Sequence, residues 1–326
     1  MTFDLPRRPR RLRGSAHIRD LVRETRLHRD DLIMPVFITH GQNIKREIPS
    51  MPGIFQYSLD RLDEELELLD NNGVHRLILF GIPPAKDDVG TDAFHDEGII
   101  QRALASIRSQ SEAFYLITDV CFCEYTDHGH CGVLRDDGTL DNDATLENLQ
   151  RQALSHAEAG AHMLAPSGMI DGMIGAMRTA LDDAGRSDLP IMSYAVKYAS
   201  AFYGPFRDAV DSAPQFGDRR AYQMDPANRR EALVEAALDV EEGADILMVK
   251  PALSYLDIIA DVRDAFDLPT ACYNVSGEYS MVKAAAAKGW VDETSMALEQ
   301  LLSMKRAGAD LILTYFARDL SPLLDR

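Results

Sequence analysis

Cysteine and tryptophan are scarce in this sequence, which has four cysteines and one tryptophan in 326 residues. Long apolar runs are missing as well. None approaches the roughly 18 residues that a membrane-spanning helix needs, and the N-terminus has no apolar segment of signal-peptide type. We therefore expect no membrane association and a cytoplasmic location. Because disulfides are rare in a reducing cytoplasm, a cysteine cluster there indicates a metal site or a reactive centre.

Basic side chains are outnumbered too, with 34 Lys and Arg against 52 Asp and Glu, for a net charge of −18. This charge opposes nonspecific binding to nucleic acid or anionic membranes, so neither is an expected partner. Residues 1–30 differ, because they contain five closely spaced arginines interrupted by two prolines, at Arg7, Arg8, Arg10, Arg11, Arg13, Pro6 and Pro9. We expect a non-helical, extended arm, which is either a solvated tail or lies across an acidic neighbouring subunit.

Residues 31–326 contain eight short apolar runs, separated by longer segments with apolar residues at helical spacing. The expected strands are 31–38, 75–81, 113–120, 162–166, 190–197, 245–250, 269–275 and 310–316. The clearest helical segments are 59–73, 142–160, 228–243 and 294–308, and each ends in a glycine that can adopt the left-handed turn which stops a helix.

This alternation predicts an α/β fold, a (β/α)8 TIM barrel formed by residues 31–326 as one catalytic domain. An open doubly wound sheet is the alternative. It is disfavoured because no glycine-rich phosphate-binding loop follows the first expected strand. In a barrel, the active site lies at the C-terminal ends of the strands.

Two of the expected strands end in lysine, at Lys197 and Lys250, and neither lysine has an acidic neighbour in the sequence. One such lysine could extend its ammonium group out of the barrel mouth into water. Two on adjacent strands would instead lower each other's pKa, and the neutral amine so produced attacks a ketone to form a Schiff base. Other strand ends carry Asp119, Ser167, Ser276 and Tyr315.

The segment after Lys197 is rich in planar hydrogen-bond donors, namely Arg207, Arg219, Arg220 and Gln223. Arginine suits bidentate carboxylate binding, and a long loop at a barrel mouth commonly acts as a lid. The alternative is a set of surface arginines on an ordinary loop.

Three cysteines lie within DVCFCEYTDHGHCG, residues 119–132, at Cys121, Cys123 and Cys131. Their spacing differs from the paired C-x-x-C motifs of structural zinc modules. We expect a zinc site of three thiolates with an open fourth position, although His128 and His130 leave a closed four-ligand site as an alternative. Cys272 lies among apolar residues and is expected in the core.

The chain resembles the zinc-dependent porphobilinogen synthases, also called 5-aminolevulinate dehydratases, over nearly its whole length. The resemblance is carried by RPRRLR, DVCFCEYTDHGHCG, SYAVKYASAFYGPFRDA, GDRRAYQM, GADILMVKP, VSGEY and RAGADLILTYF. It implies the condensation of two 5-aminolevulinate molecules to porphobilinogen with loss of two waters, in haem and tetrapyrrole biosynthesis.

The resemblance also implies residue roles. Lys250 would form the Schiff base with the substrate of the P site, and Lys197 with that of the A site. Ser276 and Tyr315 would hold the P-site carboxylate; Arg207, Arg219 and Gln223 would hold the A-site carboxylate. Asp119 and Ser167 would transfer protons, and Cys121, Cys123 and Cys131 would bind catalytic zinc.

Glu235 matches the family position that binds an allosteric magnesium ion, and the arm matches one that embraces a neighbouring subunit in a homo-octamer built from dimers. The sequence departs from the family at Gly168, Met173 and Asp127, where Asp, Arg and Ser are common. Two other hypotheses are an aldolase-like Schiff-base lyase with structural zinc, and a catalytically silent metal-binding scaffold. A pair of strand-end lysines argues against the first, and the retained lysines, arginines and Tyr315 argue against the second.

Overall fold

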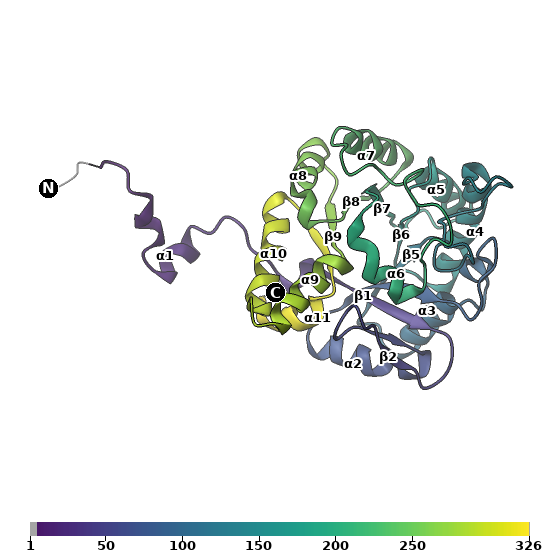
Figure 1. The fold of residues 1–326 in the computed structure, drawn as a ribbon, viewed down its shortest axis with the longest axis horizontal. Helices are drawn as coiled ribbons and strands as arrows, with labels where there is room; N and C mark the ends of the chain where they lie inside the picture. Colours follow the sequence, from purple (N-terminus) through teal and green to yellow (C-terminus); the bar gives the residue numbers. More distant parts are fainter. Residues whose placement is uncertain (1–4, 326) are drawn as a thin grey trace.

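The computed structural model of the chain describes residues 5–325. Figure 1 shows a ring of strands inside a ring of helices, with the N-terminal segment extending away from both. The helices are α1 (Ala16–Leu21), α2 (Asp63–Asn71), α3 (Ile99–Gln110), α4 (Asn142–Ala159), α5 (Met173–Asp183), α6 (Gly204–Val210), α7 (Glu231–Glu242), α8 (Leu256–Ala265), α9 (Ser276–Ala287), α10 (Glu293–Ala307) and α11 (Ala317–Leu320). Within the described residues, none of them combines the length and apolar character needed to cross a bilayer.

Eight parallel strands form the ring, and each of the eight predicted runs overlaps one of them, with β1 and β4 extending one residue past the predicted end. They are β1 (Leu32–Thr39), β4 (Arg76–Ile82), β5 (Tyr115–Val120), β6 (Met163–Pro166), β7 (Met192–Lys197), β8 (Ile246–Lys250), β9 (Thr270–Asn274) and β10 (Leu311–Thr314). The hydrogen-bonded order is β6-β5-β4-β1-β10-β9-β8-β7, and a parallel bridge between Leu164 and Ile191 joins the two ends. The predicted barrel is confirmed, and the open doubly wound sheet is wrong.

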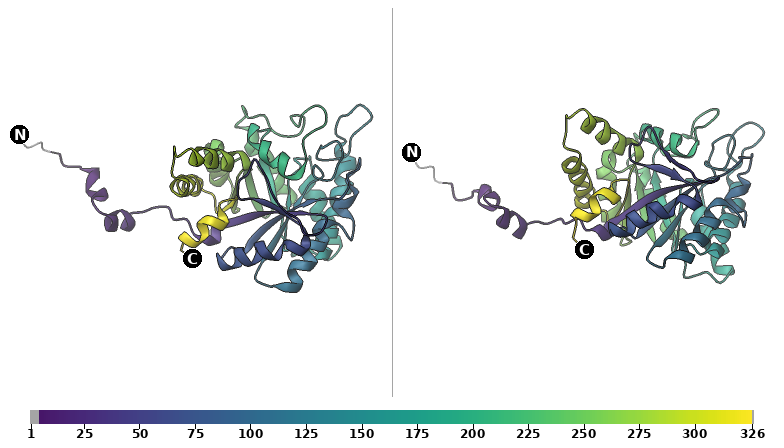
Figure 2. Two further views of the ribbon diagram at one scale, coloured as in Figure 1. Left: turned by 60° about the horizontal axis from the view of Figure 1, so that its bottom comes forward. Right: turned by 90° about the horizontal axis from the view of Figure 1, so that it is seen from below.

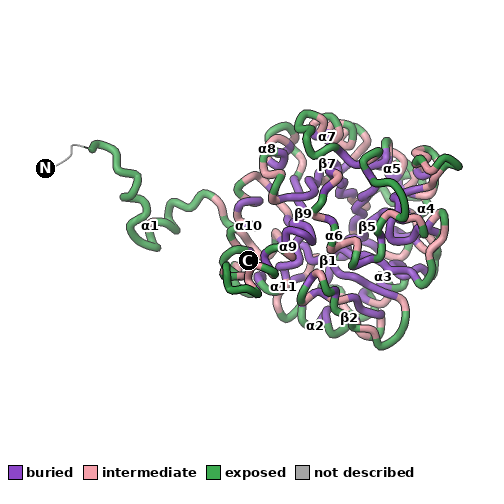
Figure 3. Tube along the Cα trace, in the orientation of Figure 1, coloured by how far each residue is buried: buried purple, intermediate pink, exposed green. Residues whose placement is uncertain are grey.

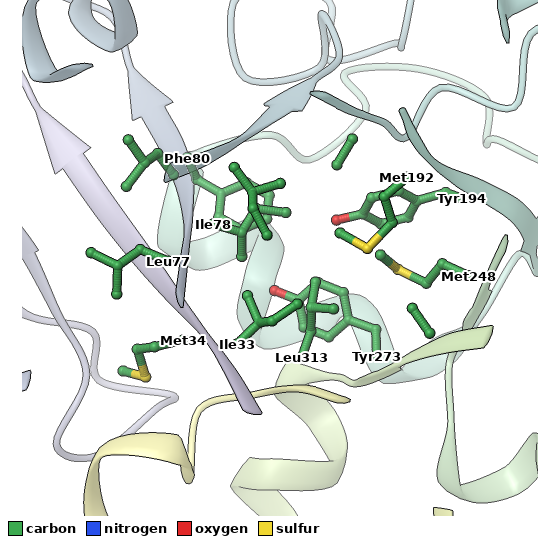
Figure 4. Close-up of a cluster of buried hydrophobic side chains, with 14 of the residues drawn as sticks. Ile33, Met34, Leu77, Ile78, Phe80, Met192, Tyr194, Met248, Tyr273 and Leu313 are labelled. Carbon is green, nitrogen blue, oxygen red and sulfur yellow. The ribbon is translucent and has the colours of Figure 1, made fainter. Parts of the chain in front are cut away.

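The strands are buried on both faces, because helices cover the outside and side chains fill the inside. Ile78, Met192, Tyr194, Met248 and Tyr273 are each at most 1% exposed, and they meet inside the ring (Figure 4). Strands covered on both faces are continuous apolar runs rather than alternating ones, which is the pattern that the sequence contains. The interior is therefore a packed core, and only the strand ends are left for polar chemistry.

Glycine ends the four helices where it was predicted to do so. Gly73, Gly160, Gly243 and Gly308 have φ values of 73°, 98°, 100° and 118°, in the left-handed region that favours glycine. Each is followed within three residues by a barrel strand. These turns therefore set where β4, β6, β8 and β10 begin.

A small antiparallel pair was not predicted. β2 (Lys45–Glu47) pairs with β3 (Phe55–Tyr57), and β3 pairs in parallel with the C-terminal part of β1. Both strands have three residues, which is too short for a periodic pattern to show in the sequence.

The N-terminal arm projects from the barrel in every view (Figures 1 and 2), and its residues from 5 to 16 are exposed (Figure 3). Residues 1–4 of the predicted arm lie outside the described residues. The expectation of a wholly extended arm is wrong, because Pro9–Arg13 forms a 3-10 helix and α1 follows it. Pro9 is the first residue of that helix, where a missing N–H group costs no hydrogen bond.

Candidate active site

Lys197 and Lys250 lie side by side at the ends of β7 and β8, where they are paired in register. Both are buried, with 4% and 5% of their surface exposed, so neither extends into water. The ammonium group of Lys197 donates a hydrogen bond to the backbone oxygen of Ser167. The sequence therefore identified a pair of lysines that the fold places together inside the barrel mouth.

Aromatic rings surround the amine of Lys250. Its Nζ atom lies 4.4 to 5.3 Å from the ring centroids of Tyr273, Tyr194, Phe206 and Tyr203. Burial and then the neighbouring charge of Lys197 lower the pKa of Lys250 to about 7. A large share of this amine is thus neutral and nucleophilic near pH 7.

Asp119 and Ser167 face the lysines from the ends of β5 and β6. Both are buried, and the Ser167 hydroxyl donates a hydrogen bond to Asp119 Oδ2 at 3.2 Å. Burial, together with the neighbouring Glu124, raises the pKa of Asp119 well above its usual range, although the two lysines partly offset this. The other carboxylate oxygen of Asp119 has no hydrogen-bond partner in the protein, so it is available to a substrate.

The three predicted metal ligands form one cluster directly after β5. The sulfur atoms of Cys121, Cys123 and Cys131 all lie within 4.8 Å of one another, and all three residues are at most 2% exposed. The Cys121 and Cys123 sulfurs are 3.5 Å apart. Sulfur ligands at about 2.3 Å from a tetrahedral zinc ion stand about 3.8 Å apart, so the three thiols fit zinc.

His128 and His130 use their ring nitrogens elsewhere. His130 contacts the Tyr222 hydroxyl and the Phe216 backbone oxygen, each at 3.1 Å. His128 Nδ1 accepts from the His130 backbone N–H, and His128 Nε2 lies 3.1 Å from the Asp88 backbone oxygen. The closed site with a histidine ligand is therefore not supported, and the two rings instead fasten the loop that carries the cysteines.

Residues 201–223, which we call the lid, cover the barrel mouth. Arg207, on α6, and the buried Arg219 both line a cavity together with the two lysines. Arg219 Nη2 donates to the backbone oxygens of Gly129 and Ser212, at 2.8 and 2.6 Å. The lid is therefore hydrogen-bonded to the cysteine loop.

Several lid donors are buried without a partner in the protein. They are Arg207 Nε, Arg219 Nε, the Ser212 hydroxyl and the side-chain amide of Gln223, whose oxygen is also unpaired. Buried polar atoms are normally hydrogen-bonded, so these atoms, two of them on residues that line the cavity, are suited to bind a ligand. Arg220 differs, because it is exposed and pairs with Asp218 on the surface, and it is therefore not part of this site.

Ser276 and Tyr315 are buried at the ends of β9 and β10, but each is hydrogen-bonded within the protein. The Ser276 hydroxyl accepts from the Phe206 backbone N–H at 3.0 Å, and the Tyr315 hydroxyl lies 3.0 Å from that of Tyr273. Neither lines the cavity around the lysines. Phe206, which belongs to the lid, thus donates to Ser276 and is also one of the rings around Lys250.

Glu235 lies away from this site, on α7. It is partly buried, and burial and then the charge of Asp171 raise its pKa. Within residues 5–325 it belongs to no group of three close metal-binding side chains.

Glu124 and the aromatic cage of Lys250 were missed from the sequence. Glu124 is 2% exposed, lines the cavity, and has one carboxylate oxygen without a partner. Its oxygen, a carboxylate oxygen of Asp119 and the Cys121 sulfur lie within 4.8 Å of one another. The sequence signal available for Glu124 was its position inside the cysteine motif, directly after Cys123.

Known proteins of one family match nearly the whole chain. A family model described as delta-aminolevulinic acid dehydratase matches residues 6–323. Delta-aminolevulinic acid dehydratase of Halalkalibacterium halodurans is 57% identical over 319 residues, covering 98% of this chain and 97% of that protein. The Bacillus subtilis protein of the same name is 57% identical over 312 residues, covering 96% of each chain.

A similar solved structure is that of delta-aminolevulinic acid dehydratase (porphobilinogen synthase) from Toxoplasma gondii ME49, in complex with the reaction product porphobilinogen. It has a TM-score of 0.96 and 41% sequence identity, covering 98% of this chain and 92% of the other. The matched family model and these relatives span almost the entire chain, so the chain belongs to the delta-aminolevulinic acid dehydratase family.

Proposed function

We propose that this protein is a porphobilinogen synthase, which condenses two molecules of 5-aminolevulinate to porphobilinogen with loss of two waters. The observation that carries the proposal is the pair of buried lysines, Lys197 and Lys250, in register at the mouth of the barrel of a family member. The solved relative from Toxoplasma gondii holds porphobilinogen as its product.

Lys250 forms the Schiff base of the P site. Its neutral amine, favoured by the pKa of about 7, attacks the ketone carbon of the first substrate, and a water is lost when the carbon–nitrogen double bond forms. Ser276 and Tyr315 hold the carboxylate of this substrate. To donate to that carboxylate, the Ser276 hydroxyl must give up the Phe202 backbone oxygen, to which it donates at 3.3 Å, a change that the lid makes possible by moving.

Lys197 forms the Schiff base of the A site. Arg207, Arg219 and Gln223 hold the carboxylate there, which is supported by their unpaired buried nitrogens. Asp119 and Ser167 move protons at the substrate amines, and their mutual hydrogen bond orients the serine hydroxyl for this transfer.

Cys121, Cys123 and Cys131 would hold a zinc ion, which would supply Lewis-acid chemistry to the A-site substrate or to a water. The support is the geometry of the thiols and the engagement of both histidines elsewhere. A site built from three free thiols requires a reducing compartment, which favours the cytoplasm.

Glu235 binds an allosteric magnesium ion, and Asp171 is the acidic residue whose charge contributes most to raising the pKa of Glu235. The arm assembles dimers into a homo-octamer. This role of the arm is supported because the exposed, arginine-rich segment projects away from its own barrel (Figure 1).

Incubation of the zinc-loaded protein with 5-aminolevulinate, followed by detection of porphobilinogen, tests the activity. Borohydride added during turnover should reduce the Schiff bases and attach substrate covalently to Lys250 and, at higher occupancy, to Lys197. Mass spectrometry that finds porphobilinogen but no labelled lysine would reject the Schiff-base mechanism and leave the activity standing.

A further inference from the structure

Glu278 is a buried carboxylate for which the proposed mechanism has no use. It lies in the first turn of α9, is 0% exposed, and has no basic partner within ion-pair distance in residues 5–325. Its carboxylate is instead held by neutral donors. Oε1 accepts from the Leu253 backbone N–H at 2.8 Å, and Oε2 accepts from Asn274 Nδ2 at 2.9 Å and from the Val275 backbone N–H at 3.0 Å.

The hydrogen bonds continue to a third strand. Asn274 Oδ1 accepts from the Thr314 hydroxyl at 2.9 Å, and the Thr314 oxygen accepts from the Phe316 backbone N–H at 3.2 Å. Asn274 and Thr314 are both 0% exposed. We call Glu278, Asn274 and Thr314 the strand-end network, because it joins the segments that follow β8, β9 and β10.

Each of these three segments carries one residue of the proposed P site. Lys250 is the last residue of β8, three positions before Leu253; Ser276 follows Val275; Tyr315 lies between Thr314 and Phe316. The network accepts hydrogen bonds from backbone N–H groups on all three segments, at Leu253, Val275 and Phe316. Its geometry therefore determines how Lys250, Ser276 and Tyr315 are placed relative to one another.

A buried carboxylate suits this task because it accepts several hydrogen bonds at once. Burial raises the pKa of Glu278 to about 7, and the donors that it accepts from oppose this rise. An amide in its place has one acceptor oxygen and turns its NH2 group towards at least one of the three donors. Glutamine therefore fills the same volume but cannot satisfy the same network.

We propose that Glu278 is a positioning residue for the P site, which acts through Asn274 and Thr314 to hold Lys250, Ser276 and Tyr315 in the arrangement that captures the first substrate. The inference deepens the proposed function and rests on it, because it presupposes a Schiff base at Lys250. It assigns Glu278 no contact with substrate.

The test is the labelling of Lys250 by borohydride in zinc-loaded protein, measured as a function of 5-aminolevulinate concentration. In Glu278→Gln, we expect the half-saturating concentration for labelling Lys250 to rise about tenfold, with labelling of Lys197 at saturating substrate unchanged. In Thr314→Val, which removes only the outer link, we expect a smaller rise of about threefold in the same direction. Steady-state kinetics should show a higher KM in both variants.

Asp310→Asn is the matched control. Asp310 Oδ2 accepts from the Thr270 backbone N–H at 2.9 Å, so it also joins β9 and β10, but at the opposite end of the barrel. The Asp310→Asn variant should differ from wild type in thermal stability but not in the 5-aminolevulinate concentration that half-saturates labelling of Lys250. If Glu278→Gln does not fold, Thr314→Val decides the question.

The outcomes separate this inference from the proposed function. Wild-type protein in which Lys250 takes no label would refute the Schiff-base mechanism and this inference with it. Normal labelling in wild type and an unchanged half-saturating concentration in the folded network variants would overturn the role of Glu278 alone. An equal rise in Asp310→Asn would also overturn it, because the effect would then reflect general destabilisation.

Discussion

The amine of Lys250 is enclosed by aromatic rings, and no carboxylate within residues 5–325 forms an ion pair with it. Rings attract the ammonium form, but they replace water that would solvate it more strongly, and burial is the largest cause of the lowered pKa. Lys197 adds a second cause, because its amine lies at the end of the neighbouring strand. The two causes can be separated by experiment.

Labelling of Lys250 at a fixed low substrate concentration should rise with pH through a midpoint near 7, because only the deprotonated amine attacks the ketone. In Lys197→Met, the loss of the neighbouring charge should move the midpoint to higher pH, by about one unit. Lys283→Met, at an ion pair with Glu293 outside the site, should leave the midpoint unchanged. The same midpoint in wild type and Lys197→Met would show that burial alone sets the pKa.

The cysteine cluster gives a second prediction at the scale of single residues. Zinc at about one hundred times its dissociation constant should stabilise the native state by about 2.7 kcal/mol, because the unfolded chain lacks the assembled site. The unfolding temperature of this 326-residue chain should therefore rise by about 4 °C on adding zinc. Cys131→Ala should lose most of this shift.

Cys272 supplies the control for this measurement, because it is equally buried but lies in β9, outside the cluster. The Cys272→Ala variant should retain the zinc-dependent rise in unfolding temperature, even though the substitution leaves the core less well packed. A zinc shift that survives in Cys131→Ala would mean that the ion binds elsewhere.

At the scale of elements, the lid and the cysteine loop form one hydrogen-bonded unit. Arg219 donates to the Gly129 backbone oxygen, Gln215 donates its backbone N–H to His128, and His130 contacts the Phe216 oxygen. Binding of metal by the cysteines restricts this loop and should therefore restrict the lid as well. The metal site would thus help to form the A site before substrate arrives.

Hydrogen exchange should detect this coupling. Removal of zinc should speed amide exchange within residues 211–223 at least several-fold, because the segment opens more often when its anchoring loop is free. Exchange in α10, on the far side of the barrel, should not change (Figure 1). Equal exchange rates in the lid with and without zinc would contradict the coupling.

The helices and strands also differ in how well the sequence predicted them. All eight barrel strands were predicted because both of their faces are buried, which makes each a continuous apolar run, and a glycine three residues upstream marks the start of four of them. β2 and β3 were missed because three residues cannot establish a period. The helical turns of the arm were missed because proline was taken to exclude them, whereas Pro9 occupies the first helical position, where it is tolerated.

The sequence predicted the parts of the candidate site whose chemistry depends on a single residue type. It missed the parts that depend on how side chains pack against one another. The strand-end lysines and the cysteines could be recognised by type and position. The cage residues Tyr194 and Tyr273 could not, since a tyrosine in an apolar strand has the same sequence signature whether or not it faces a lysine. Glu124 and Glu278 were missed for a related reason, because only the fold shows that a carboxylate is buried.

At the scale of the whole molecule, the charge is distributed unevenly. The chain carries −18 overall, yet its first 13 residues include five arginines, and those from residue 5 onward are exposed on an arm that leaves the barrel (Figure 3). Such an exposed segment gains little stabilisation from contacts with its own domain. An acidic surface on another copy of the chain can attract it, and Leu12, which is 52% exposed, can add apolar contact.

Removal of residues 1–20 should therefore reduce the mass of the assembly, from the proposed octamer to dimers, as measured by light scattering after size-exclusion chromatography.

Lysine in place of the five arginines keeps the charge but loses the planar hydrogen-bonding group. If charge alone directs the arm, the lysine variant should assemble as the wild type does, and added salt should dissociate both to a similar extent. If carboxylate pairing by guanidinium groups is required, the lysine variant should dissociate at lower salt. An unchanged assembly mass after removal of the arm would show that the barrel surfaces hold the subunits together and that the arm has another role.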